Sequence, residues 1–178
     1  DFRNTIISDW LIFVQSALLL LLPQLNITMD YVAGFDIAID FTKQLAESRG
    51  KDRERGHTQL GPHRADLRLK TDLGLVEAVL SRGQKKLFIC ALKLAQVAFL
   101  KANNKYCVVL LDDVASELDA VARLRLLTHL QQLDAQILMT AVEVDDVWPI
   151  LFQLDEQAKL FHVEHGEVTP MHFLKSDQ

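Results

Sequence analysis

The sequence predicts an α/β protein with a mainly parallel sheet flanked by helices. Helical and strand patterns alternate from residue 80 to residue 165, which is the order expected for parallel strands joined by crossover helices. Two short apolar runs, Tyr106–Leu111 and Gln136–Ala141, have the composition of buried parallel strands. The chain has 178 residues, of which 49% are hydrophobic and 24% charged, and this is sufficient for a domain with a hydrophobic core.

The N-terminal region is predicted to begin with a helix over residues 8–22, with Ser8 as its cap and Pro23 just beyond its end. The apolar stretch Trp10–Leu22 is too short to span a bilayer, because a spanning helix needs roughly 20 apolar residues. A buried helix is the favoured interpretation, and a signal-like segment and an interfacial helix are the alternatives. The elements that follow are a strand over Leu25–Tyr31, a helix over Phe35–Leu45, and a charged helix end and loop over Ala46–Gly56.

Three short strands and then the strongest helix of the chain are predicted after residue 56. The strands cover His57–Leu60, Asp66–Leu69 and Leu75–Val79, and turns occupy Gly61-Pro62 and Thr71–Gly74. The long helix begins at Ser81, and an apolar face at helical spacing is formed by Leu87, Ala91, Leu94, Ala95 and Ala98. The remaining elements are helices over Asp119–Gln132 and Asp145–Phe152 and a hairpin, Leu160–Glu164 with Glu167–Pro170, around His165-Gly166.

Charge and cysteine content narrow the class of protein. A net charge of −5 and a pI near 5.6 argue against a strongly basic nucleic-acid module, although a local basic patch is compatible with them. Cys90 and Cys107 lie in apolar segments and are interpreted as reduced core residues of a cytosolic protein, with no zinc-binding spacing.

A basic cluster interrupts the acidic background between residues 49 and 55. A solvated face is the main interpretation, and contact with a phosphate backbone is the alternative. No aromatic residue is interleaved, so stacking on bases is not indicated. The cluster consists of Arg49, Lys51, Arg53 and Arg55, interleaved with Asp52 and Glu54.

The first candidate site is Leu80–Gln84, LSRGQ, at the start of the long helix. The unpaired N–H groups of a helix start bind anions, and Ser81 adds a hydroxyl group. Gly83 permits close approach of a phosphate to the backbone, and Arg82 adds positive charge. The alternative is an ordinary serine N-cap followed by a solvated basic turn.

The second candidate site is the acid pair Asp112 and Asp113, which follows the apolar run Val108–Leu111. Ligands of open parallel sheets bind at the carboxyl ends of the strands. One carboxylate there can hold Mg²⁺, and a second can orient an attacking water. The alternative is a pair of aspartates that caps the next turn.

Together these segments resemble the ATP-binding-cassette family. LSRGQ resembles the signature motif, VVLLDD resembles a Walker B strand, and Ser116–Asp119 resembles the D-loop that follows it. Gly61–Leu67, GPHRADL, resembles the GPHR-x-D-L segment of the RecF family. The resemblance is specific over residues 57–119 and extends more weakly to Glu167. It implies a cassette-like C-terminal lobe over residues 57–178 and a partial helical arm over residues 1–56.

The resemblance also implies roles for individual residues. Asp112 would help to bind Mg²⁺, and Asp113 would position the water that attacks ATP. Transporters of this superfamily carry a histidine where this chain has Ala141, so Thr140 is the nearest polar substitute. His63 and Arg64 are either a turn surface with a local Arg–Asp pair or a support for the nucleotide site. The residues expected at ATP held by a second subunit, or at the dimer interface around it, are Ser81, Arg82, Gly83, Gln84, Ser116 and Asp119.

The function implied is that of a DNA repair and recombination protein in the bacterial cytoplasm, with no membrane partner. Such a protein would form a homodimer through ATP and Mg²⁺, bind DNA at gaps, and cooperate with RecR and RecO in loading recombinase. No G-x-x-x-x-G-K-[ST] phosphate loop occurs in the sequence, so ATPase activity is not assigned to the chain alone. The alternative is a truncated, non-catalytic interaction module. A chromosome-maintenance ATPase is disfavoured because no long heptad pattern precedes the signature.

Overall fold

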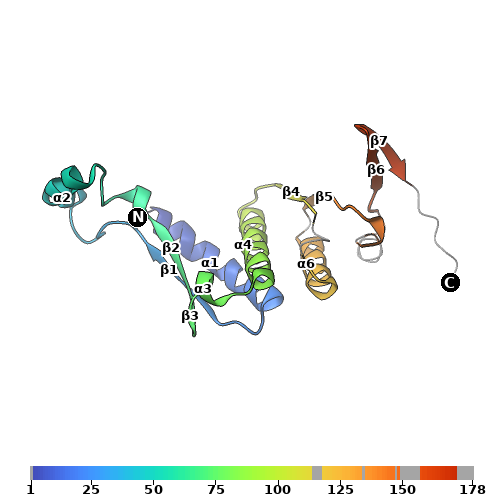
Figure 1. Cartoon of the computed structure of the whole chain (residues 1–178), viewed down its shortest axis with the longest axis horizontal. Coiled ribbons are helices and arrows are strands. Elements are labelled where there is room, and N and C mark those ends of the chain that lie inside the picture. The colour runs from blue at the N-terminus through green and yellow to red at the C-terminus, as the bar shows by residue number, and fades with distance from the viewer. Residues whose placement is uncertain (1, 114–117, 134, 147, 149–156, 172–178) are drawn as a thin grey trace. The chain divides into compact units, whose positions relative to one another are not determined.

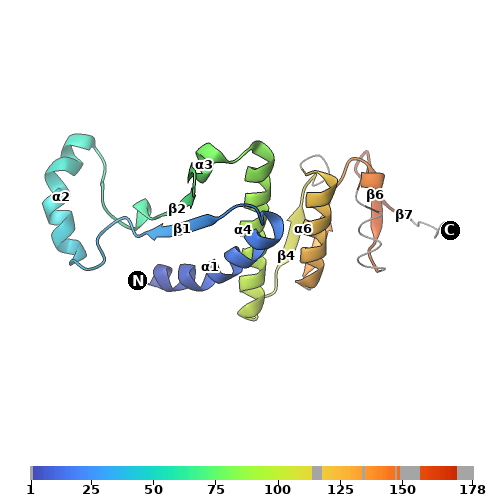
Figure 2. The same cartoon turned by 90° about the horizontal axis from the view of Figure 1, so that it is seen from below.

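The computed structural model describes residues 2–113, 118–133, 135–146, 148 and 157–171. The chain forms two compact units, Asp1–Val109 and Leu110–Gln178, and each is considered by itself. Figures 1 and 2 show the elements of both units.

The core of the first unit lies between two helices, α1 (Phe2–Leu21) and α4 (Arg82–Ala102). The rings of Phe13 and Phe99 meet edge to face across this contact, with centroids 5.8 Å apart. The buried side chains of the two helices are Val14, Ala17, Leu18 and Leu21 on α1, and Phe88, Ala91, Leu94 and Ala95 on α4. The predicted apolar face of the long helix is therefore confirmed in its central part, with Leu87 and Ala98 at its half-buried edges.

Helix α1 begins earlier than the predicted cap at Ser8. The Ser8 hydroxyl group donates a hydrogen bond of 2.8 Å to the carbonyl of Asn4, which is the bond of a serine inside a helix rather than at its start. One side of α1 is buried, whereas Ile12 and Leu19 are 65% and 69% exposed. Helix α1 is long and apolar enough to cross a membrane by length and composition alone, a property that it shares with core helices of soluble proteins and with signal sequences.

A three-stranded antiparallel sheet accompanies these helices. It contains β1 (Ile27–Val32), β2 (Asp66–Thr71) and β3 (Gly74–Leu75) in that order, and Ile27 lies opposite Thr71. The predicted strand over Leu75–Val79 is wrong, because β3 ends at Leu75 and α3 (Val76–Val79) follows. The N–H of Leu80 closes this short helix on the carbonyl of Val76, whose side chain is buried.

Between β1 and β2 the chain forms α2 (Phe41–Arg55) and a short 3₁₀ helix, η1 (Pro62–Arg64). The predicted helix over Phe35–Leu45 is displaced toward the C-terminus, because Asp40 caps α2 and Gly56, at φ 73°, ends it. The charged segment is thus mostly helix. His57–Leu60 is not a strand, since the N–H of Gln59 bonds to the Asp52 carboxylate at 2.9 Å.

In the C-terminal part, β4 (Val108–Leu111) and β5 (Gln136–Met139) form a two-stranded sheet, and α6 (Ala120–Gln132) connects them. A short 3₁₀ helix, η2 (Val144–Asp146), follows, and the rest of the helix predicted over Asp145–Phe152 lies largely outside the described residues. The predicted hairpin is confirmed as the antiparallel pair β6 (Leu160–Glu164) and β7 (Glu167–Met171).

The α/β class is confirmed, and the arrangement of the sheets is mixed rather than uniform. The β1–β2–β3 sheet and the β6–β7 hairpin are antiparallel. The expectation that β4 and β5 are buried is wrong for this chain, because both strands alternate between half-buried and exposed residues. Val108, Leu110 and Leu138 are 52%, 73% and 55% exposed, so one apolar face of this sheet is open.

Candidate functional site

The start of α4 is a complete capping box. The Ser81 hydroxyl oxygen accepts a hydrogen bond from the Gln84 N–H at 3.3 Å, and the Gln84 side-chain oxygen accepts one from the Ser81 N–H at 2.9 Å. The serine N-cap, which was the alternative interpretation of this segment, is therefore present. Its hydrogen bonds hold Ser81 and Gln84, two of the four predicted signature residues. Arg82 and Gly83 are exposed on the first turn, and a Cβ atom at Gly83 would meet nothing within 4 Å.

The acid pair lies at the end of β4 and is connected to the residue that follows β5. The Thr140 N–H donates to the Leu111 carbonyl at 2.9 Å, which continues the pairing of the two strands. The Thr140 hydroxyl group donates to the Asp112 carboxylate at 2.5 Å and accepts from the Asp113 N–H at 3.0 Å. One threonine thus orients the first carboxylate and holds the backbone of the second aspartate.

Asp113 has an unusual backbone conformation, with φ at 46°. Residues other than glycine rarely adopt this left-handed conformation, although aspartate tolerates it better than most. The hydrogen bond from its N–H to the Thr140 hydroxyl oxygen stabilises the turn. The sequence indicated Thr140 only as a substitute for a missing histidine, and it did not indicate the left-handed turn.

The Asp112 carboxylate retains capacity for a cation. An ionised carboxylate has about four lone-pair positions, and the bond from Thr140 occupies one of them. Within the described residues no cluster of three or more His, Cys, Asp or Glu side chains is present. A site of this composition suits Mg²⁺, because that ion is held by one or two carboxylates and keeps several of its waters.

Of the two predicted D-loop residues, the structure describes only Asp119. Ser116 lies outside the described residues. Asp119 is the N-cap of α6, and its carboxylate accepts a hydrogen bond from the Ala122 N–H at 2.8 Å. Ser81–Gln84 belong to the first unit, whereas Asp112, Asp113 and Asp119 belong to the second, so the structure describes two separate parts of the candidate site.

The GPHR segment is held by a close contact between two glycines. The Gly61 N–H donates to the Gly34 carbonyl at 3.0 Å, and a Cβ atom on Gly34 would lie 2.4 Å from the Gly61 carbonyl oxygen. Gly34 has φ at 82°, so both its backbone and its surroundings require glycine. The Arg3 guanidinium group also donates to the Pro62 carbonyl at 2.8 Å. The sequence predicted neither of these contacts.

His63 and Arg64 are both exposed on η1. The Nε2 atom of His63 lies 3.2 Å from the Thr58 carbonyl oxygen. The local Arg–Asp pair that the sequence allowed is not found, since Arg64 has no ion-pair partner among the residues that the structure describes.

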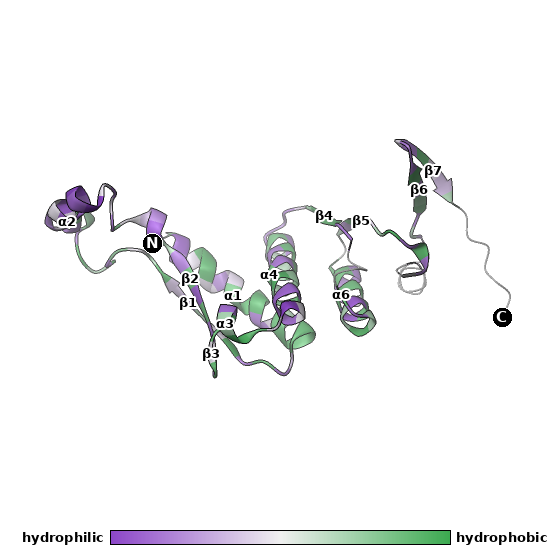
Figure 3. Ribbon diagram, viewed as in Figure 1, coloured by the Kyte–Doolittle hydropathy of each residue, from purple (hydrophilic) through white to green (hydrophobic). Residues whose placement is uncertain are grey.

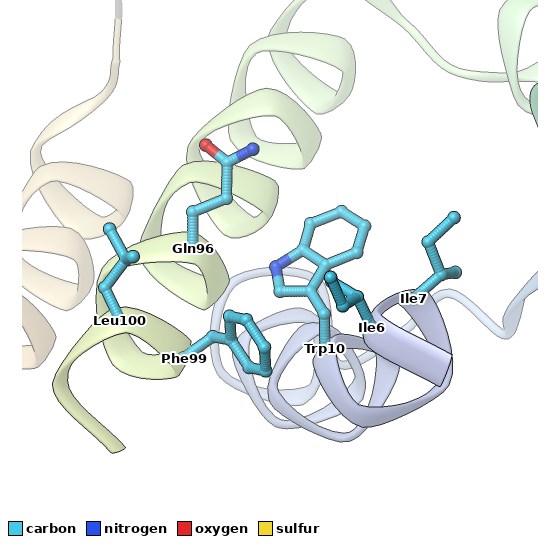
Figure 4. A pocket seen from close by; sticks show the side chains of 6 residues that line it. All are labelled: Ile6, Ile7, Trp10, Gln96, Phe99 and Leu100. Carbon is cyan, nitrogen blue, oxygen red and sulfur yellow. The ribbon is translucent and has the colours of Figure 1, made fainter. Parts of the chain in front are cut away.

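An apolar pocket of about 380 Å³ lies between α1 and the C-terminal end of α4 (Figure 4). Within the described part of the chain, the buried indole N–H of Trp10 has no hydrogen-bond partner there. Along α4 this pocket is at the opposite end from Ser81, so it does not contribute to the signature turn. Its lining residues are Ile6, Ile7, Trp10, Gln96, Phe99 and Leu100.

The chain matches the family model described as "RecF/RecN/SMC N terminal domain" over residues 13–169. It is 47% identical over 167 residues to the DNA replication and repair protein RecF of Acinetobacter baumannii strain ATCC 17978, covering 94% of this chain and 46% of the relative. It is 42% identical over 164 residues to the RecF protein of Stutzerimonas stutzeri, covering 89% of this chain and 43% of the relative.

The fold is also similar to that of solved RecF structures. A structure titled as the recombination mediator protein RecF-ATPrS in the RecFOR pathway matches with a TM-score of 0.70 and 22% identity, over 96% of this chain and 46% of that one. A structure of RecF-ATP from the same pathway also has a TM-score of 0.70. The chain spans about half the length of the relatives that it matches. The chain belongs to the RecF/RecN/SMC family, and the two relatives described above are RecF proteins.

Proposed function

We propose that this chain supplies the signature and acid-pair parts of the ATP site of a RecF-like DNA repair protein. The observation that carries the proposal is the joining of Asp112, Asp113 and Thr140 at the ends of β4 and β5, in a member of this family. Two carboxylates at strand ends, one oriented by a hydroxyl group and one placed by a constrained turn, suit hydrolysis of a metal-bound phosphate.

In this proposal Asp112 holds Mg²⁺ and Asp113 positions the attacking water. Mg²⁺ held by Asp112 would supply neutralisation of the negative charge on the phosphates of ATP. The Thr140 hydroxyl group donates to one Asp112 oxygen, and the other carboxylate oxygen would be available to hold the cation. Asp113, whose backbone is fixed by Thr140, accepts a hydrogen bond from the water and so aligns it.

The signature turn acts on ATP bound to a second subunit. The Ser81 hydroxyl oxygen accepts the bond from Gln84 N–H, but its O–H remains a donor for a phosphate oxygen. The N–H groups of Arg82 and Gly83 lie in the first turn, where a helix has no carbonyl partners for them, and the Arg82 side chain adds charge. Gln84 keeps Ser81 in place, and Ser116 and Asp119 line the dimer interface.

The partners follow from the family. RecF is named in its relatives as a DNA replication and repair protein, and the solved neighbours are RecF bound to ATP or ATPrS in the RecFOR pathway. We therefore propose ATP-dependent DNA binding at gaps, formation of a homodimer through ATP, cooperation with RecR and RecO in loading recombinase, and a location in the bacterial cytoplasm without membrane attachment.

The test is ATP-dependent dimerisation of a complete protein that carries this sequence. Sedimentation with Mg-ATP is expected to show dimers for the unmodified protein and monomers for Ser81→Arg, because the arginine side chain fills the position of the phosphate. Lys93→Gln is the matched control, since Lys93 is an exposed residue near the middle of the same helix. Dimers of Ser81→Arg at the same ATP concentration would refute the proposal.

A second candidate function is that of an interaction module that does not bind ATP alone. The observation in its favour is that the sequence contains no phosphate-loop motif, and so lacks its nest of N–H groups and its lysine. Calorimetric titration of Mg-ATP into the 178-residue chain is expected to show no saturable heat. Saturable binding would exclude the module and indicate a phosphate cradle of another kind.

A further inference from the structure

Helix α2 carries two arginines, one helical turn apart, that pair with no carboxylate among the described residues. Arg49 and Arg53 are four residues apart, so they lie on the same side of the helix. The small residues Ala46 and Gly50 lie on the same side, and a Cβ atom at Gly50 would meet nothing within 4 Å. We call these four residues the arginine face. Figure 3 shows the strongly hydrophilic character of α2.

Hydrogen bonds on the other side of α2 hold the helix in place without any contribution from the arginine face. Gln44 and Ser48 are buried on the other side, where Gln44 bonds to the backbone of Asp36 and Ile39. The half-buried Asp52 carboxylate accepts hydrogen bonds of 2.9 Å from the Ser48 hydroxyl group and from the Gln59 N–H. Asp52, which precedes Arg53, is therefore held away from it by structural hydrogen bonds, and no ion pair between Arg53 and the exposed Glu54 is found among the described residues.

The two arginines have no structural partner within the residues that the structure describes. Both are exposed, and no ion pair or hydrogen bond of either side chain is found there. Arg55 differs, because its guanidinium group donates to the Gln59 side chain at 2.8 Å. Arg49 and Arg53 are thus two exposed permanent charges that have no partner among the described residues.

We propose that the arginine face binds the phosphate backbone of duplex DNA. Arginine pairs with phosphate through two parallel hydrogen bonds, and one helical turn separates these two by about 6 Å, which allows contact with neighbouring phosphates. The small side chains between them permit close approach of the helix backbone. No aromatic side chain lies on this face, so the contact is to the backbone and independent of sequence. The inference rests on the proposed function only in identifying the polyanion as DNA.

The test is fluorescence anisotropy of a labelled duplex with the full 178-residue chain, in the absence of ATP, over a series of salt concentrations. Two phosphate contacts contribute a slope of about 1.8 in log Kd against log salt concentration. A fourfold rise in salt concentration therefore lowers their contribution to the binding constant by about 12-fold. The variant Arg49→Gln with Arg53→Gln is expected to lower the slope by about 1.8 and to raise Kd by about tenfold at low salt. Circular dichroism is expected to show unchanged helix content.

The matched control is Lys93→Gln with Lys105→Gln, which removes the same charge from exposed positions outside α2. An unchanged slope in this control assigns the effect to the arginine face rather than to net charge. Equal losses in both variants, no loss in the arginine variant, or no binding by the unmodified chain would each overturn the proposal. Equal, arginine-dependent binding to vesicles of anionic lipid would also overturn it. These outcomes are separate from the proposed function, because the assay contains no ATP and the dimerisation assay contains no DNA.

Discussion

Replacing Thr140 by valine tests how the acid pair is positioned. Valine keeps the branched shape that suits the end of a strand but removes the hydroxyl group. The change therefore eliminates the 2.5 Å bond to the Asp112 carboxylate and the 3.0 Å bond from the Asp113 N–H, while the backbone bond from Thr140 to Leu111 remains.

The size of the effect follows from these two bonds. A hydrogen bond to a charged group contributes about 1.5–3 kcal/mol and a neutral one about 0.5–1.5 kcal/mol when water does not replace them. Asp112 is exposed, so water replaces much of the first bond, and we expect a stability loss of only about 1 kcal/mol. If the misoriented carboxylate stabilises the transition state by about 1.4 kcal/mol less, kcat falls about tenfold.

The assay is steady-state ATP hydrolysis by a complete protein that carries this sequence, together with urea unfolding. Thr140→Val is expected to lower kcat by about tenfold, because Thr140 orients the carboxylate that would hold Mg²⁺ and the backbone of the aspartate that aligns the water. Thr140→Ser keeps the hydroxyl group and is expected to retain most of the activity. Equal activities of Thr140→Val and the unmodified protein, or equal losses in the valine and serine variants, would refute the positioning role.

Three further predictions concern stability and association. Gly34→Ala is expected to destabilise the chain by about 2 kcal/mol or more in urea unfolding, because Gly34 has a φ of 82° and an added Cβ atom would lie 2.4 Å from the Gly61 carbonyl oxygen. Gly50→Ala, on the open side of α2, is expected instead to stabilise the chain by about 0.5–1 kcal/mol. Ser81→Ala is expected to cost about 1 kcal/mol in the same measurement, and no loss would contradict the capping box. The open face of β4 and β5 predicts self-association of the chain in light scattering, which Leu110→Lys with Leu138→Lys is expected to reduce; a monodisperse unmodified monomer would contradict this.

The sequence predicted those elements whose signals are local. Ser81 and Gln84 have the spacing of a capping box, and the helix begins there. The turn residues His165-Gly166 between two alternating runs predicted the hairpin. The α2 boundaries were predicted wrongly because the charged composition of Ala46–Gly56 suggested a helix end and loop, although Asp40 and Gly56 were available as cap signals.

The contacts that the sequence did not predict join residues far apart in the chain. Thr140 is 28 residues from Asp112, and no local pattern predicts that its hydroxyl group reaches that carboxylate. Gly34 touches Gly61 only because the chain returns from α2 alongside β1. The burial of β4 was also overestimated, because an apolar run indicates a strand but not whether this chain covers both faces.

The central claim is that the signature of one subunit acts on the acid pair of another. Its most direct test is a mixture of two inactive variants of a complete protein, Ser81→Arg and Asp113→Asn, assayed for ATP hydrolysis. A two-fold symmetric mixed dimer contains one site in which both parts are intact, so mixing is expected to give ATP hydrolysis well above that of either variant alone, even though Ser81→Arg does not form dimers with itself. Failure of every mixing ratio to exceed the activities of the separate variants would contradict the account.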